Sequence, residues 1–144
     1  MAYNKFNLFT DDLVKGVYNF SSDVFKLILL NAAPIATNHV YADVSGNELS
    51  TANGYTAGGG AMTITLANVT GTETITGSDV TWTASGGSIG PFRYAALYDT
   101  TPTSPLKPLI AWWDYGTNLT ITAGNQFVAQ PNAGSPTGTV YTLA

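Results

Sequence analysis

Hydrophobic and polar positions alternate along two short segments in the middle of the chain. In residues 62–66, Met62, Ile64 and Leu66 fall on one side and threonines on the other, and residues 79–84 repeat the pattern. Period-two alternation with β-branched polar residues is typical of antiparallel strands that bury one face. We therefore expect a half-buried strand in each segment, with the three apolar side chains of the first on one face.

Three other segments are apolar at nearly every position. Residues 24–31 are bounded by serines and by Pro34, which cannot continue a strand, and residues 92–98 and 109–113 have a similar composition. Apolar runs of this length between turn residues are typical of strands buried on both faces. The alternation within residues 92–98 predicts four side chains on one face: Phe92, Tyr94, Ala96 and Tyr98.

Shorter strand candidates complete the set: residues 39–44, 72–76, 119–122, 127–130 and 139–143. Roughly nine to ten short strands, with turn residues between them, predict an all-β fold, an antiparallel β-sandwich or jelly roll. A chain of 144 residues is most simply one domain. We expect that domain over residues 13–144, preceded by an N-terminal arm.

The expected arm, residues 1–12, has an aromatic residue at every third position: Tyr3, Phe6 and Phe9. This spacing fits either a short amphipathic helical turn or an extended segment that lays its rings against a partner. Isolated helices of this length are marginal in water, which favours the extended, docked arm. The three rings are therefore candidate contacts with another subunit.

Composition narrows the classes of partner. Charged residues make up only 10% of the chain and the net charge is −4, with five scattered basic residues, so a nucleic-acid partner is not expected. Low charge favours β structure and is also typical of surfaces covered by neighbouring subunits.

There is no cysteine, the N-terminus does not have the pattern of a secretory signal, and the longest apolar run is too short to span a membrane. We expect synthesis in the cytoplasm and no membrane partner.

Candidate catalytic and metal-binding residues are few. His39, the only histidine, has no nucleophile motif beside it, and a structural role is the simpler interpretation. Asp99 and Asp114 each end a predicted strand and could meet at one rim, as the two carboxylates of a glycosidase do, although strand-end aspartates more often shape turns. No calcium-loop spacing is present. We expect no enzyme activity, no cofactor and no metal.

The adjacent indoles of Trp112 and Trp113 must point to opposite faces of a strand. One should fill the core, while the other is either covered, exposed as a sugar-stacking platform beside Tyr115, or used at a subunit interface. Arg93 lies in an otherwise apolar strand, where a buried guanidinium must be paired. An aspartate of the same chain is the expected partner, and a carboxylate on a neighbouring subunit is the alternative.

Four sequence segments resemble a group of small structural proteins from the virions of tailed bacteriophages. They are Y-A-D-V (41–44), N-G-Y-T-A-G-G (53–59), S-G-G-S-I-G-P-F-R-Y-A-A-L-Y-D (85–99) and W-W-D-Y-G (112–116). The resemblance spans most of residues 3–122. It implies a capsid decoration (cement) protein, and it supplies no catalytic motif.

That resemblance also implies partners and a location. A decoration protein would bind the major capsid protein on the outer surface of the virion, would assemble in the cytoplasm of the host bacterium, and would act as a homotrimer. The candidate capsid or subunit contacts are Tyr3, Phe6, Phe9, Arg93, Trp112 and Trp113. Two other hypotheses stay open: a glycan-binding module of a head or tail fibre, and a tail or connector component.

Overall fold

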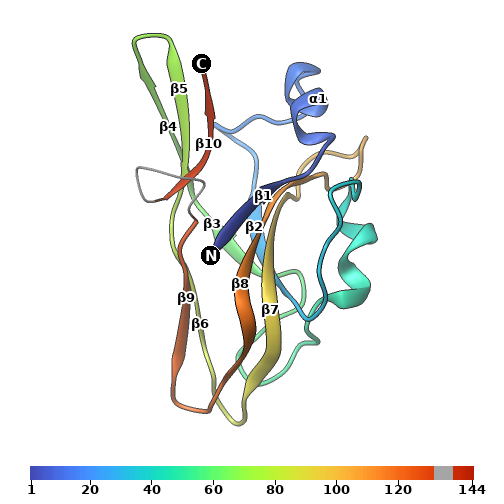
Figure 1. Ribbon diagram of the computed structural model, residues 1–144, viewed down its shortest axis with the longest axis vertical. Helices are drawn as coiled ribbons and strands as arrows, with labels where there is room; N and C mark the ends of the chain where they lie inside the picture. The colour runs from blue at the N-terminus through green and yellow to red at the C-terminus, as the bar shows by residue number, and fades with distance from the viewer. Residues whose placement is uncertain (132–137) are drawn as a thin grey trace.

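The computed structural model describes residues 1–131 and 138–144 (Figure 1). These residues form ten strands, one α-helix and two 3₁₀ helices. The strands are β1 (Ala2–Lys5), β2 (Phe25–Leu30), β3 (Gly60–Met62), β4 (Ile64–Val69), β5 (Thr72–Gly77), β6 (Val80–Thr83), β7 (Ile89–Asp99), β8 (Leu109–Ile121), β9 (Gln126–Ala129) and β10 (Thr139–Leu143). The helices are α1 (Phe9–Val14), η1 (Tyr41–Asp43) and η2 (Ser45–Asn47).

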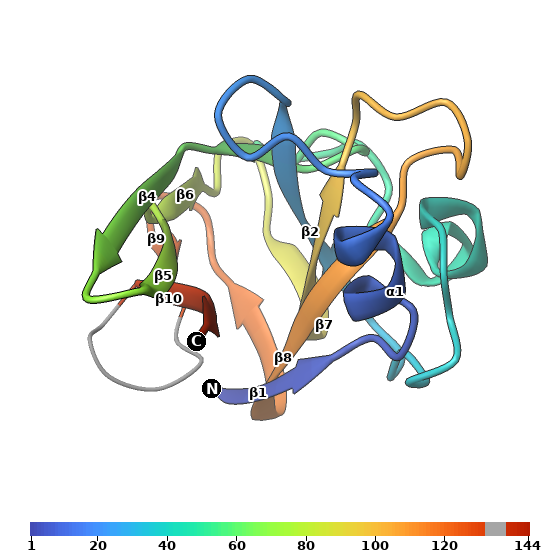
Figure 2. The same ribbon diagram turned by 90° about the horizontal axis from the view of Figure 1, so that it is seen from above.

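The strands build two layers, as an antiparallel sandwich requires. One layer is a five-stranded sheet of order β1-β8-β7-β2-β3, and the other consists of the sheet β10-β5-β4 and the pair β6-β9. Figure 2 shows the second layer on one side of the molecule, facing the five-stranded sheet. All the strand pairs are antiparallel. The all-β, sandwich-like fold predicted from the alternation is therefore confirmed.

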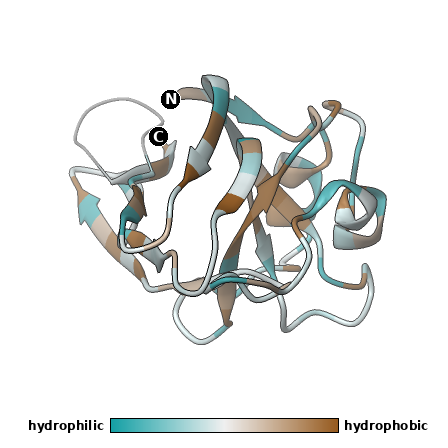
Figure 3. Ribbon diagram, turned by 90° about the horizontal axis from the view of Figure 1, so that it is seen from below, coloured by the Kyte–Doolittle hydropathy of each residue, from teal (hydrophilic) through white to brown (hydrophobic). Residues whose placement is uncertain are grey.

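The five-stranded sheet is buried on both faces, and Figure 3 shows hydrophobic colour concentrated on its central strands. Leu27 and Leu29 of β2 point into the core between the layers, whereas Ile28 and Leu30 point into a second, smaller core. Segment 31–47 contributes to that second core through Val44. The prediction of a strand buried on both sides in residues 24–31 is confirmed.

Residues 39–44 do not form the predicted strand. They contain the 3₁₀ helix η1, because the Asp43 carboxylate accepts the backbone N–H groups of His39 (2.8 Å) and Val40 (3.1 Å). These N–H groups would otherwise serve a strand ladder, and Asp commonly competes with regular structure in this way. The same two hydrogen bonds lower the pKa of the Asp43 carboxyl.

The predicted strand over residues 62–66 is split at Thr63. Met62 ends β3 in the five-stranded sheet, and Ile64 begins β4 in the opposite layer. Ser78 fixes the backbone at the point where the chain passes from one layer to the other. Its hydroxyl accepts the Thr63 N–H (3.0 Å), and its N–H donates to the Thr63 carbonyl (2.9 Å). Met62 is consequently buried while Leu66 is 39% exposed, so the expectation of one shared apolar face was wrong.

Strand β7 also departs from simple alternation. Its pairing with β8 shifts register between Phe92 and Tyr94, as at a β-bulge. Phe92 therefore points into the core between the layers, whereas Tyr94, Ala96 and Tyr98 contact the second core. The predicted common face holds for three of the four residues, and the bulge places Phe92 on the opposite face.

The predicted N-terminal arm is docked within its own chain. Ala2–Lys5 forms β1, which pairs with β8 as an edge strand of the five-stranded sheet, and α1 follows. The expected boundary between residues 12 and 13 falls inside α1. The first half of the segment is therefore an extended, docked strand, and the second half begins a short helix. Each interpretation of the aromatic spacing holds for one half.

Candidate functional site

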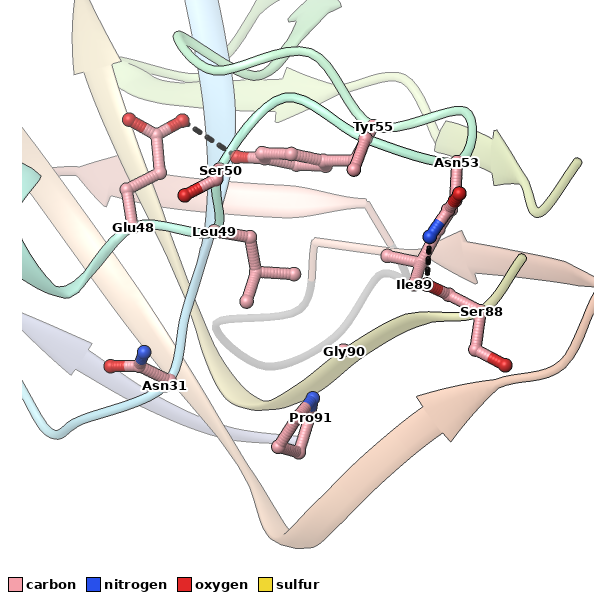
Figure 4. Close-up of a pocket in the computed structure, with 11 residues that line it drawn as sticks. Asn31, Glu48, Leu49, Ser50, Asn53, Tyr55, Ser88, Ile89, Gly90 and Pro91 are labelled. Carbon is pink, nitrogen blue, oxygen red and sulfur yellow. Dashed lines mark hydrogen bonds between the residues drawn. The ribbon is translucent and has the colours of Figure 1, made fainter. Parts of the chain in front are cut away.

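A pocket of about 330 Å³ opens between segment 48–55 and the start of β7 (Figure 4). Its lining is rich in amide, hydroxyl and carboxylate groups, and Tyr55 supplies an aromatic wall. The contributing residues are Asn31, Glu48, Leu49, Ser50, Ala52, Asn53, Tyr55, Ser88, Ile89, Gly90 and Pro91. Ligand pockets are usually lined mainly by apolar side chains with a few converging polar groups, so this polar lining differs from the common type.

Glu48 organises one wall of this pocket. Its carboxylate accepts hydrogen bonds from the Tyr41 hydroxyl (2.5 Å), the Tyr55 hydroxyl (2.7 Å) and the Gly58 N–H (2.6 Å). We call Tyr41, Glu48 and Tyr55 the Glu48 cluster. The Tyr55 hydroxyl in turn accepts the Leu29 N–H (3.1 Å), which connects the cluster to β2.

Burial and the neighbouring carboxylate keep both tyrosines of the cluster protonated. Desolvation raises the pKa of Tyr41 and of Tyr55 well above the ordinary value, and the hydrogen bond to Glu48 raises the pKa of each further. Each hydroxyl is therefore a fixed donor rather than a base. The cluster holds segment 41–58 in place.

Asn53 shapes the opposite wall. It adopts a left-handed conformation with φ of 55°, which Asn tolerates better than most residues, and its side-chain amide donates to the Ser88 carbonyl (2.9 Å). The neighbouring Gly54, at φ of 98°, lies so close to the Thr83 carbonyl oxygen that a Cβ would meet it at 2.0 Å. Asn53 and Gly54 therefore fix the loop against segment 83–88.

His39 and Asp12 form a separate polar pair. The His39 Nε2 lies 2.7 Å from Asp12 Oδ2, and Asp12 is buried. The pair connects α1 to segment 31–47, which covers part of the second core. A structural role for His39 stays a prediction.

Asp99 and Asp114 do not meet. Asp114 pairs with Tyr94 across β7 and β8, and Asp99 lies five positions further along β7, roughly 16 Å away at the rise of a strand. The carboxylate pair considered for glycosidase chemistry is absent from the fold. Each aspartate has its own environment.

Asp99 is completely buried at the end of β7. Its Oδ1 accepts the Thr101 N–H (2.9 Å), and Oδ2 has no donor among the described residues when the carboxyl is ionised. Burial raises the pKa of Asp99 to about 7, and the nearby Asp23 carboxyl raises it as well. A protonated Asp99 can donate to Asp23, which satisfies the otherwise unpaired oxygen.

Arg93 is paired within the chain, as expected. Its Nε and a terminal N–H₂ donate to the two Asp114 oxygens at 2.7 and 2.9 Å, and its guanidinium lies 5.3 Å from the ring centroid of Tyr94. The pair is partly exposed, not buried. It stands at the bulge in β7, on the surface of the five-stranded sheet.

The two indoles point to opposite faces, as the adjacent positions require. Trp113 is buried in the core between the layers, with Tyr3 packed edge-on at 5.7 Å between ring centroids. Trp112 is half-buried beneath Phe6, with ring centroids 4.5 Å apart. Neither indole is the exposed sugar platform that one hypothesis required.

The arm aromatics are mostly internal. Phe6 and Phe9 are fully buried, Phe6 in the second core and Phe9 in the core between the layers. The expectation that these two rings contact a partner is corrected, because their own chain covers them completely. Tyr3 is half-buried, and burial raises its pKa to about 12.

Sequence reasoning missed the Glu48 cluster. The available signal was its composition and spacing: Glu48 is one of two glutamates in the chain, and a tyrosine lies seven residues away on each side. By contrast, residues 85–99, one of the segments that carry the resemblance, do contribute Ser88 to Pro91 to the pocket.

Comparison with known proteins identifies no relative: no family model, no curated protein and no solved structure matches the chain. Among the described residues, no three side chains of the metal-binding types are grouped as a metal site would need. No helix in the described part of the chain has the length and apolar character to cross a membrane.

Proposed function

We propose that this protein is a non-enzymatic structural protein that binds the outer surface of a tailed-phage capsid and stabilises the mature head. The major capsid protein would be its partner. Support for the virion assignment comes from the resemblance carried by residues 41–44, 53–59, 85–99 and 112–116. Support for a binding role comes from the surface of the N-terminal segment.

That surface is the observation that carries the proposal. The first fourteen residues bury Phe6 and Phe9 yet expose Leu8 and Val14, the latter to 88%. Ile35, 61% exposed, belongs to the same region, since the Asn7 N–H donates to the Ala36 carbonyl (2.9 Å). Exposed apolar side chains on a surface segment are candidate contacts with a partner.

A protein that binds only the assembled capsid lattice stabilises that lattice. A protein that contacts neighbouring capsid subunits together has no complete site on a free subunit, so its binding free energy adds to the stability of the shell. Leu8, Val14 and Ile35 replace Phe6 and Phe9 as the proposed capsid contacts.

The polar groups that could perform chemistry are occupied by contacts within the fold. Glu48 accepts three hydrogen bonds, and Asp12 is paired with His39. The two hydroxyls beside Glu48 belong to tyrosines that burial and the carboxylate keep protonated. A binding role therefore fits these residues better than catalysis.

The test is binding to purified capsids that lack the protein. Wild-type protein should bind with a copy number that scales with the number of capsid subunits, and the double variant Leu8→Asp, Val14→Asp should bind much more weakly. Val128→Asp is the matched control, because Val128 is 44% exposed on β9 and lies outside the proposed surface. A copy number that matches the one tail of each particle, and not the many capsid subunits, would instead favour the tail or connector hypothesis. Equal binding by all variants would reject the proposed surface.

Glycan binding is a second candidate, and the polar pocket is what favours it. Its amide and hydroxyl groups from Asn31, Ser50 and Ser88 could hydrogen-bond a sugar. Ser50→Trp would fill the pocket mouth and abolish such binding on a glycan array. Trp112→Ala should leave it unchanged, because Trp112 is not among the lining residues.

A further inference from the structure

Among residues 1–131 and 138–144, no strand pairs with the outer side of β4. This strand ends the order β10-β5-β4, and five of its six residues are exposed. Figures 1 and 2 both show β4 at the margin of the molecule, in a hairpin with β5 that extends beyond the main body. An edge strand presents unpaired N–H and C=O groups, which are a template for another strand.

The other edges of the described sheets are less open to pairing. Strand β1 is four residues long and carries Lys5, β3 has three residues, and β10 has a register shift at its start. Strands β6 and β9 have four residues each. Short length, charge and irregularity all discourage edge pairing. Strand β4 has six residues in continuous register with β5 and contains no charge and no proline.

The register identifies which groups of β4 are free. Ser78 N–H donates to the Thr63 carbonyl, so the hydrogen-bonded pairs with β5 continue at alternate residues, Thr65, Ala67 and Val69. The N–H and C=O groups of Ile64, Leu66 and Asn68 therefore point away from β5, toward the open edge.

These three residues can be paired by a second copy of the same strand. An antiparallel copy of β4, related by a twofold axis at Leu66, pairs Ile64 with the second copy's Asn68 and Leu66 with its own equivalent. Every outward group then meets an outward group, which gives three hydrogen-bonded residue pairs and a continuous six-stranded sheet. Because β4 is uncharged, two copies with a net charge of −4 each can approach at this edge without a like-charge contact.

We propose that two copies of this protein associate through antiparallel pairing of their β4 strands, centred on Leu66. The pairing is a dimer contact that does not depend on the capsid role. It brings the two exposed Leu66 side chains together on one face and places Thr65 opposite Ala67 on the other.

The first test measures the mass of purified wild-type protein against concentration by sedimentation equilibrium, without capsids. Wild type should dimerise reversibly. Leu66→Pro removes an outward N–H and leaves the bonds to β5 intact, so it should weaken the dimer at least roughly tenfold in Kd. Leu66→Thr, which keeps the N–H, should dimerise more tightly than Leu66→Pro. A wild-type monomer at all concentrations would overturn the proposal, as would a trimer that Leu66→Pro leaves intact.

Charge complementation distinguishes a true contact from misfolding of a variant. Leu66→Lys and Leu66→Glu should each be monomeric, because the twofold axis places identical charges directly opposite. A 1:1 mixture of the two should form the heterodimer. Folded variants that stay monomeric when mixed would refute the Leu66-centred register. These measurements use no capsid, so they test the dimer independently of the proposed capsid role.

Discussion

Arg93 and Asp114 form a bidentate ion pair across β7 and β8, with donor–acceptor distances of 2.7 and 2.9 Å. The Asp114 Oδ1 also accepts the Gly116 N–H (2.7 Å), so one carboxylate contacts both the guanidinium and the following backbone of β8. This arrangement stands where the register of β7 shifts, and it holds the irregular part of the strand to its neighbour.

The first prediction concerns this pair. The hydrogen bonds from Arg93 lower the pKa of the Asp114 carboxyl, so Arg93→Gln should move that pKa up toward about 3.9. Carboxyl NMR titration measures the change. Arg93→Lys should give an intermediate value, because Lys keeps the charge but loses the bidentate fork. An unchanged Asp114 pKa in Arg93→Gln would show that the pair does not persist in solution.

The Glu48 cluster should be important for stability. In Glu48→Gln, an amide N–H₂ replaces one oxygen and faces a tyrosine or backbone donor, so at least one buried donor loses its acceptor. We expect a loss of about 1–3 kcal/mol in the free energy of unfolding, measured with urea. The double-mutant cycle of Glu48→Gln with Tyr55→Phe should show strong coupling, because Tyr55 donates directly to Glu48. Additive losses would contradict the described contact.

Asp99 predicts a pH dependence of stability. Its pKa is raised to about 7 in the folded protein against about 3.9 in the unfolded chain, so between these values the folded state holds a proton that the unfolded state has lost. Its contribution to the free energy of unfolding therefore falls as pH rises from about 4 to about 7 and is constant above.

Asp99→Asn tests that dependence. The amide keeps an acceptor for the Thr101 N–H and supplies a permanent donor toward Asp23, so the variant resembles the protonated acid. Its stability relative to wild type should increase from pH 4 to pH 7. Asp23→Asn is the companion variant, and it should reduce the slope only partly, because burial is the larger cause of the Asp99 shift. A difference between Asp99→Asn and wild type that is independent of pH would refute the assignment.

The N-terminal segment should be part of the folding unit. Phe6 is fully buried against Trp112 and the second core, so Phe6→Ala should cost about 3–5 kcal/mol. Val128→Ala, at an exposed position, should change stability by less than about 0.5 kcal/mol. Urea unfolding of both variants measures these costs. A Phe6→Ala protein as stable as wild type would mean that the segment is an accessory arm after all.

Much of the fold follows from local pattern. The doubly apolar run in β2 and the alternation of Val80 and Trp82 against threonines in β6 predicted strands that the structure contains. Such patterns report how many faces of a strand are buried. They do not report where a strand changes sheets, and the split at Thr63 and the bulge after Phe92 both depend on pairing with distant residues.

The polar contacts were only partly predictable for the same reason. An arginine in an apolar strand requires a partner, and Asp114 was among the few nearby acids, so the Arg93 pair could be expected. The Glu48 cluster could not, because the contacts join Glu48 to the Gly58 N–H and the Tyr41 hydroxyl across loops without periodicity. Residues 39–44 were likewise predicted as a strand but contain a 3₁₀ helix, because the Asp43 carboxylate accepts backbone N–H groups of neighbouring residues.

The most direct test of the capsid role is the rupture temperature of phage heads. Heads assembled without this protein should release DNA at a lower temperature than wild-type heads and should tolerate low salt less well. Adding purified protein back should restore both properties. Add-back of the Leu8→Asp, Val14→Asp variant should restore neither. Heads whose rupture temperature is the same with and without the protein would contradict the proposal that it cements the shell.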